Sequence, residues 1–262
     1  MSVDSNSRPV DAIILAAGKG TRMNSDLPKV LHEVAGRPMV WWVVQACKQA
    51  GVSRCILVVG YKGELVREAF AGELGVEFVE QAEQLGTAHA AQMAEPSFAG
   101  QAVGDVFVLA GDGPLIRGKT LARLLEVHRR TSAAATLATA VIDDPTGYGR
   151  IVRDAAGNFA AIVEQKDATE NQRAIREVNP SYYCFRGESF FQTLDQVGSN
   201  NAQGEYYITD APGLLKKQNQ TVTVVDAVPP SDVLSINTPE QLAQVDRVLR
   251  DRLDPTCAGA TE

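Results

Sequence analysis

The first half of the chain alternates between short apolar runs and stretches in which apolar residues recur at helical spacing. Runs rich in branched apolar side chains predict strands at residues 12–15, 55–59, 76–79 and 106–109. Helical spacing predicts helices at residues 39–50, 64–71, 87–94 and 120–130, and a fifth apolar run covers residues 133–141. This alternation predicts an α/β protein with a mainly parallel mixed sheet flanked by helices on both faces.

The pattern changes in the second half of the chain. Apolar segments at residues 149–153 and 160–163 predict a hairpin with its turn at Gly157. Later segments predict a strand at 178–185, a helix at 188–194, a strand at 221–225 and a closing helix at 238–252. Thr238 and Pro239 begin that last helix, because proline is favoured at the first helical position. We expect one domain over residues 10–252, with an inserted substrate half, and flexible tails at 1–9 and 253–262.

Composition indicates a globular protein of the cytoplasm. The 32 acidic and 25 basic residues give a net charge of −7, which does not favour a nucleic-acid partner. The four cysteines are scattered and lack the paired spacing of a zinc site or a disulfide framework, as expected in a reducing compartment. The amino terminus has no signal-peptide core, and no apolar run approaches the roughly 20 residues that span a bilayer. We therefore expect neither a nucleic-acid nor a membrane partner.

The loop after the first predicted strand carries the strongest chemical signal. It reads A-A-G-K-G-T-R-M-N-S-D-L-P-K and contains Gly18, Gly20, Arg22 and Lys29. Glycines allow a ligand to approach the backbone closely, and fixed cations beside them suit a triphosphate. Met23 stands where a dinucleotide site needs its third glycine, and the spacing of a P-loop is absent. We expect Arg22 to hold the outer phosphates and Lys29 to neutralise charge at the α-phosphorus.

A magnesium ion is the second expected source of positive charge. Asp112 ends the buried run 106–109, and parallel strands deliver their carboxyl ends to one shared crevice. A carboxylate there can bind Mg²⁺ while water and phosphate complete the octahedron, and the amide oxygen of Asn237 can serve as a second ligand. Each residue also has a structural interpretation, Asp112 in a turn and Asn237 before a helix cap.

Further polar residues are ambiguous by themselves. Gln81, Gly86 and Thr87 either read the edge of a nucleobase or form a helix cap. Glu164 and Asn179, with the polar stretches 144–151 and 203–210, suit sugar hydroxyls, although any one of them is more often structural.

Several motifs together resemble a known family. They are L-A-A-G-K-G-T-R-M, Q-A-E-Q-L-G-T-A-H-A, D-D-P-T-G-Y-G-R-I, I-V-E-Q-K-D-A-T and N-A-Q-G-E-Y-Y-I-T-D. The first resembles the signature loop of sugar-phosphate nucleotidyltransferases. The full set resembles the uridylyltransferase (pyrophosphorylase) part of the bacterial bifunctional N-acetylglucosamine-1-phosphate uridylyltransferase/glucosamine-1-phosphate acetyltransferase. The resemblance implies a Rossmann-like nucleotidyltransferase fold and the Mg²⁺-dependent reaction of UTP with N-acetylglucosamine 1-phosphate to UDP-N-acetylglucosamine and pyrophosphate.

The resemblance also implies roles for individual residues. Arg22 and Lys29 fall on catalytic positions, and Asp112 and Asn237 on the Mg²⁺ ligands. The positions implied to contact uridine are Leu15, Ala16, Ala17, Gly18, Gln81, Gly86 and Thr87. Those implied to surround the sugar phosphate are Gly149, Glu164, Asn179, Tyr207 and Thr209.

The chain departs from the family pattern in two places. Asn179 is followed by Pro-Ser-Tyr, where the family has Thr-Gly and an aliphatic residue, and Pro180 removes a backbone N–H near the sugar site. The acetyltransferase β-helix is absent from the chain, so we expect neither acetyltransferase activity nor a trimer driven by that β-helix. Two alternatives remain: a nucleotidyltransferase for another substrate, such as glucose 1-phosphate or dTTP, and a non-catalytic nucleotide-sensing subunit.

Overall fold

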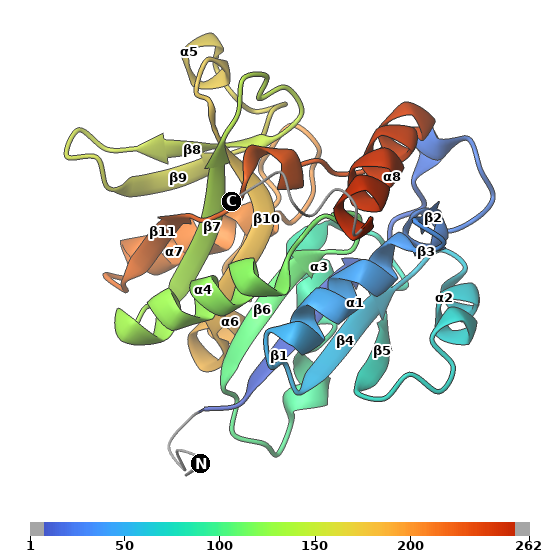
Figure 1. Cartoon of the computed structure of the whole chain (residues 1–262). Helices are drawn as coiled ribbons and strands as arrows, with labels where there is room; N and C mark the ends of the chain where they lie inside the picture. Colours follow the sequence, from blue (N-terminus) through green and yellow to red (C-terminus); the bar gives the residue numbers. More distant parts are fainter. Residues whose placement is uncertain (1–7, 255–262) are drawn as a thin grey trace.

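The fold is built around one large mixed sheet. A computed structural model describes residues 8–254, and the expected tails fall mostly outside this range. Within it, nine strands form a single sheet whose main path runs β11-β7-β10-β6-β1-β4-β5 (Figure 1). Every pairing along this path is parallel except those of β10, which runs antiparallel to both β6 and β7. The expected mainly parallel mixed sheet is confirmed.

The bounds of the elements follow the chain order. The strands are β1 (Val10–Ala16), β2 (Glu33–Val34), β3 (Arg37–Pro38), β4 (Arg54–Val59), β5 (Val76–Glu80), β6 (Asp105–Ala110), β7 (Ala135–Val141), β8 (Gly149–Arg153), β9 (Phe159–Val163), β10 (Glu177–Arg186) and β11 (Val222–Asp226). The helices are α1 (Met39–Gln49), α2 (Gly63–Ala69), α3 (Thr87–Gln92), α4 (Gly118–Arg130), α5 (Glu170–Arg173), α6 (Gly187–Leu194), α7 (Ala211–Lys217) and α8 (Pro239–Leu253).

Both faces of the sheet are covered at its centre, which explains why β1, β4 and β6 are largely apolar runs without alternating polar residues. In β1, Ile14 packs into the core beneath α1, α4 and α8, whereas Ile13 packs into the core beneath α3, α6 and α7. Successive side chains of a strand point to opposite faces, so one strand supplies both cores. The expected helices on both faces are confirmed.

The ends of the predicted elements shift by one or two residues, and a few elements were not expected. Helix α3 ends at Gln92 and helix α2 at Ala69, each two residues before its predicted end. The predicted hairpin is formed by β8 and β9, with Gly157 at a φ of 81° in its turn. The short strands β2 and β3 and the helices α5 and α7 were not predicted.

The order of the strands indicates where on the sheet a ligand would bind. Strands β4 and β5 lie on one side of β1 and β6 on the other, so the strand order reverses between β1 and β6. Ligands of open α/β sheets bind at such a reversal, beyond the carboxyl ends of the strands. This position lies beside Ala16 and Ala110, which end β1 and β6.

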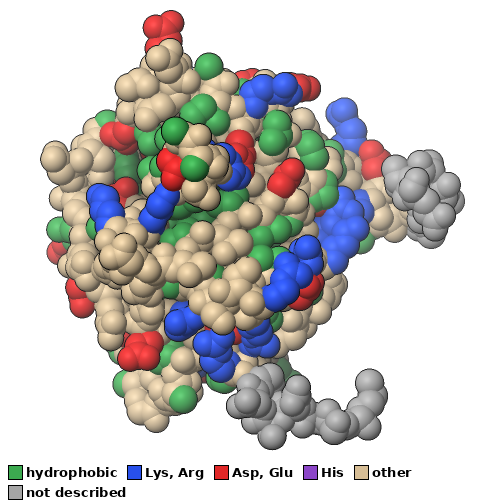
Figure 2. All heavy atoms as spheres, turned by 90° about the vertical axis from the view of Figure 1, so that its left-hand side faces the viewer, with side chains coloured by type: hydrophobic (Ala, Val, Ile, Leu, Met, Phe, Trp, Pro, Cys, Tyr) green, Lys and Arg blue, Asp and Glu red, His purple; other side chains and the backbone are tan. Residues whose placement is uncertain are grey.

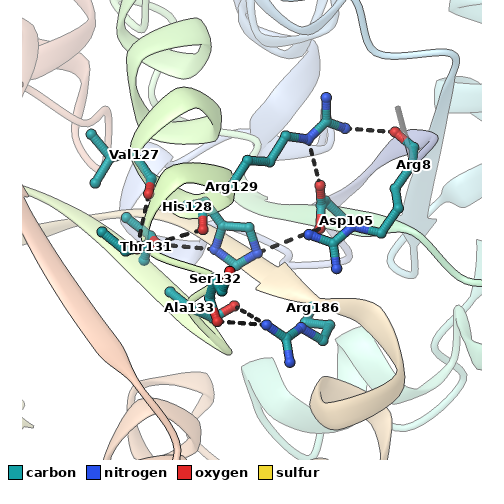
Figure 3. A network of polar contacts seen from close by, with 10 residues as sticks. Arg8, Asp105, Val127, His128, Arg129, Thr131, Ser132, Ala133 and Arg186 are labelled. Carbon is teal, nitrogen blue, oxygen red and sulfur yellow. Dashed lines mark hydrogen bonds and ion pairs between the residues drawn. The ribbon is translucent and has the colours of Figure 1, made fainter. Parts of the chain in front are cut away.

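The opposite edge of the sheet is closed by a polar cluster around Asp105, the first residue of β6 (Figure 3). Its carboxylate accepts a 2.7 Å hydrogen bond from Arg129 and lies 3.5 Å from the ring of His128, which is completely buried. Arg8 contacts it at 3.6 Å, and Arg129 also donates to the carbonyl of Arg8. Burial raises the pKa of Asp105, but His128 and Arg129 outweigh this effect and hold its pKa below the ordinary value.

The surface carries charges of both signs. On the face shown in Figure 2, Lys and Arg side chains are interspersed with Asp and Glu over the described residues. None of the helices within residues 8–254 is both long and apolar enough to pass through a membrane.

Candidate active site

The loop after β1 owes its shape to its glycines. Gly20 has a φ of 68°, and a side chain there would lie 2.6 Å from the Cβ of Lys29. Gly18 has no atom within 4 Å of the place where a side chain would begin. Gly20 therefore allows the stem of Lys29 to pack against the loop, whereas Gly18 leaves open space beside the sheet.

Four predicted residues meet at the mouth of this space. The Nζ of Lys29 donates to the carboxylate of Asp112 and, at 2.7 Å, to Oδ1 of Asn237. Arg22 donates to the same Asn237 oxygen at 2.8 Å. The sequence separations reach 215 residues, so the fold and not local structure creates this cluster. Two cations and one carboxylate leave one net positive charge, a suitable environment for phosphate oxygens.

Asn237 is held in place by the start of helix α8. Its backbone N–H donates to Oε1 of Gln241 at 2.7 Å, and Thr238 caps the helix by accepting from the Gln241 N–H. The predicted start of this helix, with Thr238 before Pro239, is confirmed. The N–H of Ile236 donates to the Asp112 carbonyl at 3.1 Å, which ties the loop before α8 to the end of β6.

A cavity of about 340 Å³ lies beneath this cluster, at the carboxyl ends of β1 and β6. Lys29 and Asp112 line it. So do all seven residues that the resemblance implied for uridine, namely Leu15, Ala16, Ala17, Gly18, Gln81, Gly86 and Thr87.

Gln81 has a side chain whose orientation is fixed by its neighbours. Its Nε2 lies 3.0 Å from the Gly86 carbonyl and 3.0 Å from Nδ1 of His89. An amide NH₂ group has two donors, so both are used when His89 Nδ1 acts as the acceptor. Among residues 8–254 no donor is bonded to the side-chain Oε1 of Gln81, which can accept from a ligand N–H in the cavity.

The residues expected around the sugar phosphate lie next to this cavity. Glu164, Tyr207 and Thr209 line a second cavity of about 210 Å³. A side chain at Gly149 would lie 3.4 Å from the Glu164 carboxylate and 3.7 Å from the Cβ of Asn179, so the three residues are neighbours. Asn179 donates at 2.6 Å to the hydroxyl of Tyr183, which lines the larger cavity. The two predicted sets are thus linked through the contact of Asn179 with Tyr183.

Glu164 is the carboxylate of the second cavity. Burial raises its pKa above the ordinary value, and Asp167 and Asp210 add to this effect. Thr209 and Arg150 act in the opposite direction. Burial thus disfavours the ionised form of Glu164, and hydrogen-bond donors from a ligand would stabilise that form.

The donor set at the mouth of the larger cavity suits a hard divalent cation. Carboxylate and amide oxygens of Asp112 and Asn237 both contact one ammonium group, so they can converge on one positive charge. Within residues 8–254, no three His, Cys, Asp or Glu side chains gather into a metal site made of protein alone. Mg²⁺ needs no such cage, because it is commonly bound by one or two protein oxygens with water and substrate phosphates.

Several cavity residues were not predicted from the sequence. They include Gln84, Ser181, Tyr183, Glu205 and Ile208. Gln84 and Glu205 lie within motifs that carried the resemblance, which was the available signal. Tyr183 had no such signal, because a tyrosine in an apolar strand is normally a core residue.

Known proteins share both the sequence and the fold. A family model described as the MobA-like NTP transferase domain matches residues 12–181. The "Bifunctional protein GlmU" of Heliobacterium modesticaldum is 48% identical over 92% of this chain and 52% of its own length. That of Geobacter metallireducens is 46% identical over 93% of this chain and 51% of its own length. The chain therefore spans about half the length of these curated relatives.

Solved structures agree on the fold. A UDP-glucose pyrophosphorylase in complex with UDP-glucose has a TM-score of 0.77 at 15% identity, covering 93% of this chain and 99% of its own. An apo UDP-glucose pyrophosphorylase has a TM-score of 0.75 over 94% of this chain and 100% of its own. At this identity the likeness concerns the fold alone. Because the family model matches well over half of the chain, the protein belongs to the MobA-like NTP transferase family.

Proposed function

We propose that this protein is a sugar-1-phosphate uridylyltransferase. A phosphate oxygen of N-acetylglucosamine 1-phosphate attacks the α-phosphorus of UTP and forms a new P–O bond. The bond between the α-phosphorus and the bridging oxygen to the β-phosphate breaks, and pyrophosphate leaves with the electron pair. The products are UDP-N-acetylglucosamine and pyrophosphate. The curated relatives named as bifunctional GlmU proteins, at 46–48% identity, support this choice.

One observation carries the proposal. Two cations, Arg22 and Lys29, converge with Asp112 and Asn237 at the mouth of a cavity. Its walls contain Gly18, Gly86 and the acceptor oxygen of the Gln81 amide. Both substrates are anions, so the main barrier is the approach of like charges. Positive groups fixed in a partly buried site stabilise the additional charge that develops in the transition state.

The acceptor at Gln81 supports a particular class of base. Uracil and thymine present an N–H between two carbonyl groups, which can donate to the Gln81 oxygen. Cytosine presents a lone pair at the same position and would face that oxygen without a hydrogen bond. A polar group left unpaired in a buried site is costly, so CTP should be rejected more strongly than dTTP.

The charged and amide side chains at the mouth of the cavity have separate roles in this reaction. Lys29 leaves its contact with Asp112 when phosphate arrives, and Arg22 binds the outer phosphates from the exposed side of the loop. Asp112 and Asn237 would hold Mg²⁺. When bound, the ion neutralises phosphate charge and orients the leaving group. No side-chain base is required, because the attacking phosphate is already ionised at neutral pH.

A substrate panel tests the proposal. Pyrophosphate release is measured with UTP, dTTP or CTP, each combined with N-acetylglucosamine 1-phosphate or glucose 1-phosphate, with and without Mg²⁺. The expected result is fastest release with UTP and N-acetylglucosamine 1-phosphate, dependent on Mg²⁺. Faster release with dTTP or glucose 1-phosphate would assign another specificity. UTP binding without release in any combination would instead support a nucleotide-sensing subunit.

A further inference from the structure

Strand β10 contains an irregularity where it passes the sugar-phosphate region. Its pairing with β7 shifts between Val178 and Tyr182, so β10 carries extra residues there, of which Asn179 pairs with β8 instead. Ser181 adopts a φ of 64°, in the left-handed region that non-glycine residues seldom occupy. Pro180 has no backbone N–H. Its loss of pairing with β7 therefore leaves no donor without a partner.

The bulge brings Asn179 and Tyr183 together. Residues four apart in a regular strand are about 13 Å apart along its axis, too far for these side chains to bond. Here Nδ2 of Asn179 lies 2.6 Å from the hydroxyl of Tyr183. The backbone N–H of Ser181 donates to Oδ1 of the same asparagine at 3.2 Å.

These two contacts fix the orientation of the amide. If the amide flipped, the NH₂ group would face the Ser181 N–H, and two donors would oppose each other. The Asn179 side chain is buried, and Tyr183 is 1% exposed. Burial raises the pKa of the Tyr183 hydroxyl, whose oxygen accepts the hydrogen bond from Asn179. Within residues 8–254 the second N–H of the Asn179 amide has no hydrogen-bond partner, so it can donate to a ligand.

The free donor belongs to the sugar side of the site. Asn179 and the Glu164 carboxylate lie on either side of Gly149. Because Gly149 has no side chain, the space between them is open. A donor and an acceptor across a glycine suit a sugar that presents both an acceptor oxygen and a hydroxyl donor. We propose that Tyr183 is a positioning residue for the sugar phosphate, acting through the amide of Asn179. This inference deepens the proposed function and rests on it.

The chain offers a matched control in the adjacent residue. Tyr182 is also 1% exposed, and its hydroxyl donates to the Asp232 carbonyl at 3.3 Å on the other face of the sheet. Tyr182→Phe and Tyr183→Phe each remove one buried hydroxyl and keep the ring. Only Tyr183→Phe releases the Asn179 amide.

The test separates sugar recognition from general damage. For Tyr183→Phe we expect KM for N-acetylglucosamine 1-phosphate to rise about tenfold, with KM for UTP changed less than about twofold. Tyr182→Phe should leave both KM values near wild type. Asn179→Ala should raise the sugar-phosphate KM more, and adding Tyr183→Phe to it should have little further effect, because both act through one amide. An unchanged sugar-phosphate KM in Tyr183→Phe, or additive losses in the double variant, would overturn the inference.

A binding measurement keeps this inference distinguishable from the proposed function. Calorimetric titration with N-acetylglucosamine 1-phosphate requires no turnover. If wild type binds the sugar phosphate without turnover and Tyr183→Phe weakens binding about tenfold, the positioning role stands while the uridylyltransferase proposal fails. If wild type turns over and Tyr183→Phe matches it in both measurements, only the positioning role fails. Absence of both binding and turnover in wild type would sink both.

Discussion

Gly86 offers a sharp test of how the cavity is built. It precedes helix α3 with a φ of 118° and a ψ of 178°, a combination that is essentially restricted to glycine. A Cβ there would lie 2.5 Å from the carbonyl oxygen and 2.6 Å from the backbone nitrogen of Tyr206. Backbone hydrogen bonds fix Tyr206 on both sides, to Leu85 and to Ala88. Gly86→Ala therefore introduces both backbone strain and a steric clash.

The magnitude follows from these two contributions. The backbone conformation costs an alanine about 1–3 kcal/mol. Relief of the clash requires a shift of about 0.9 Å, from 2.5 Å to the 3.4 Å of an ordinary contact, which resembles overpacking at about 1–3 kcal/mol. The expected loss of stability is thus about 2–6 kcal/mol. A shift of the loop also moves the Gly86 carbonyl that orients Gln81, so KM for UTP should rise.

Gly72→Ala is the matched control, because Gly72 has a φ of 83° but no atom within 4 Å of a new Cβ. Its expected cost is about 1–2 kcal/mol, because alanine is strained at a positive φ but meets no clash there. Urea denaturation gives both free energies of unfolding, and pyrophosphate release gives KM for UTP. Equal losses in the two variants, or an unchanged KM for UTP in folded Gly86→Ala, would refute the steric argument.

Three further predictions concern charged groups. Lys29→Ala should lower kcat at least about a hundredfold with a smaller effect on UTP binding, whereas Lys19→Ala, whose ammonium lies over the Tyr61 ring, should change kcat less than about threefold in the same assay. Asp112→Ala should raise the Mg²⁺ concentration for half-maximal rate about tenfold or more, and an unchanged titration would remove it from the metal site. Asp105→Asn should cost about 3 kcal/mol at pH 7 by urea denaturation. Because the pKa of Asp105 is lowered, its contribution is fully present above about pH 4 and is lost as the pH falls through the lowered pKa, so the difference in stability between the two proteins should narrow as the pH falls.

Most of the sheet could be predicted because its strands are buried on both faces and separated by helices. The strands β1, β4 and β6 are continuous apolar runs, and their predicted ends are within about two residues of those observed. Strands β2 and β3, with two residues each, are too short to show any periodicity. Helix α7 was missed because its sequence A-P-G-L-L-K-K contains two residues that usually end helices. Proline is tolerated there because it lies in the first turn.

The candidate site also has features that the sequence predicts and features that it does not. Residues on the loops after β1 and β6 were predictable, since the carboxyl ends of parallel strands share an edge. Their mutual contacts were not predictable, because Arg22 meets Asn237 across 215 positions of sequence. The contact of Asn179 with Tyr183 depends on the bulge at Pro180, and strand alternation counted from a single sequence does not reveal the two extra residues that β10 carries against β7.

The reversed direction of β10 explains why the proposed sugar side and the proposed nucleotide side of the site are adjacent. Because β10 runs antiparallel to β6, Tyr183 pairs with Val108 near the carboxyl end of β6, and Asn179 lies on the same side of the sheet. The far end of β10 pairs with Asp105, within the polar cluster at the opposite edge. If β10 were parallel to β6, its first residues would lie beside Asp105 instead. The length of β6, at 3.3 Å per residue, would then separate them by about 20 Å from the loop after β1. Because β10 is antiparallel, its first residues, including Asn179, lie at the edge of the sheet where the parallel strands end.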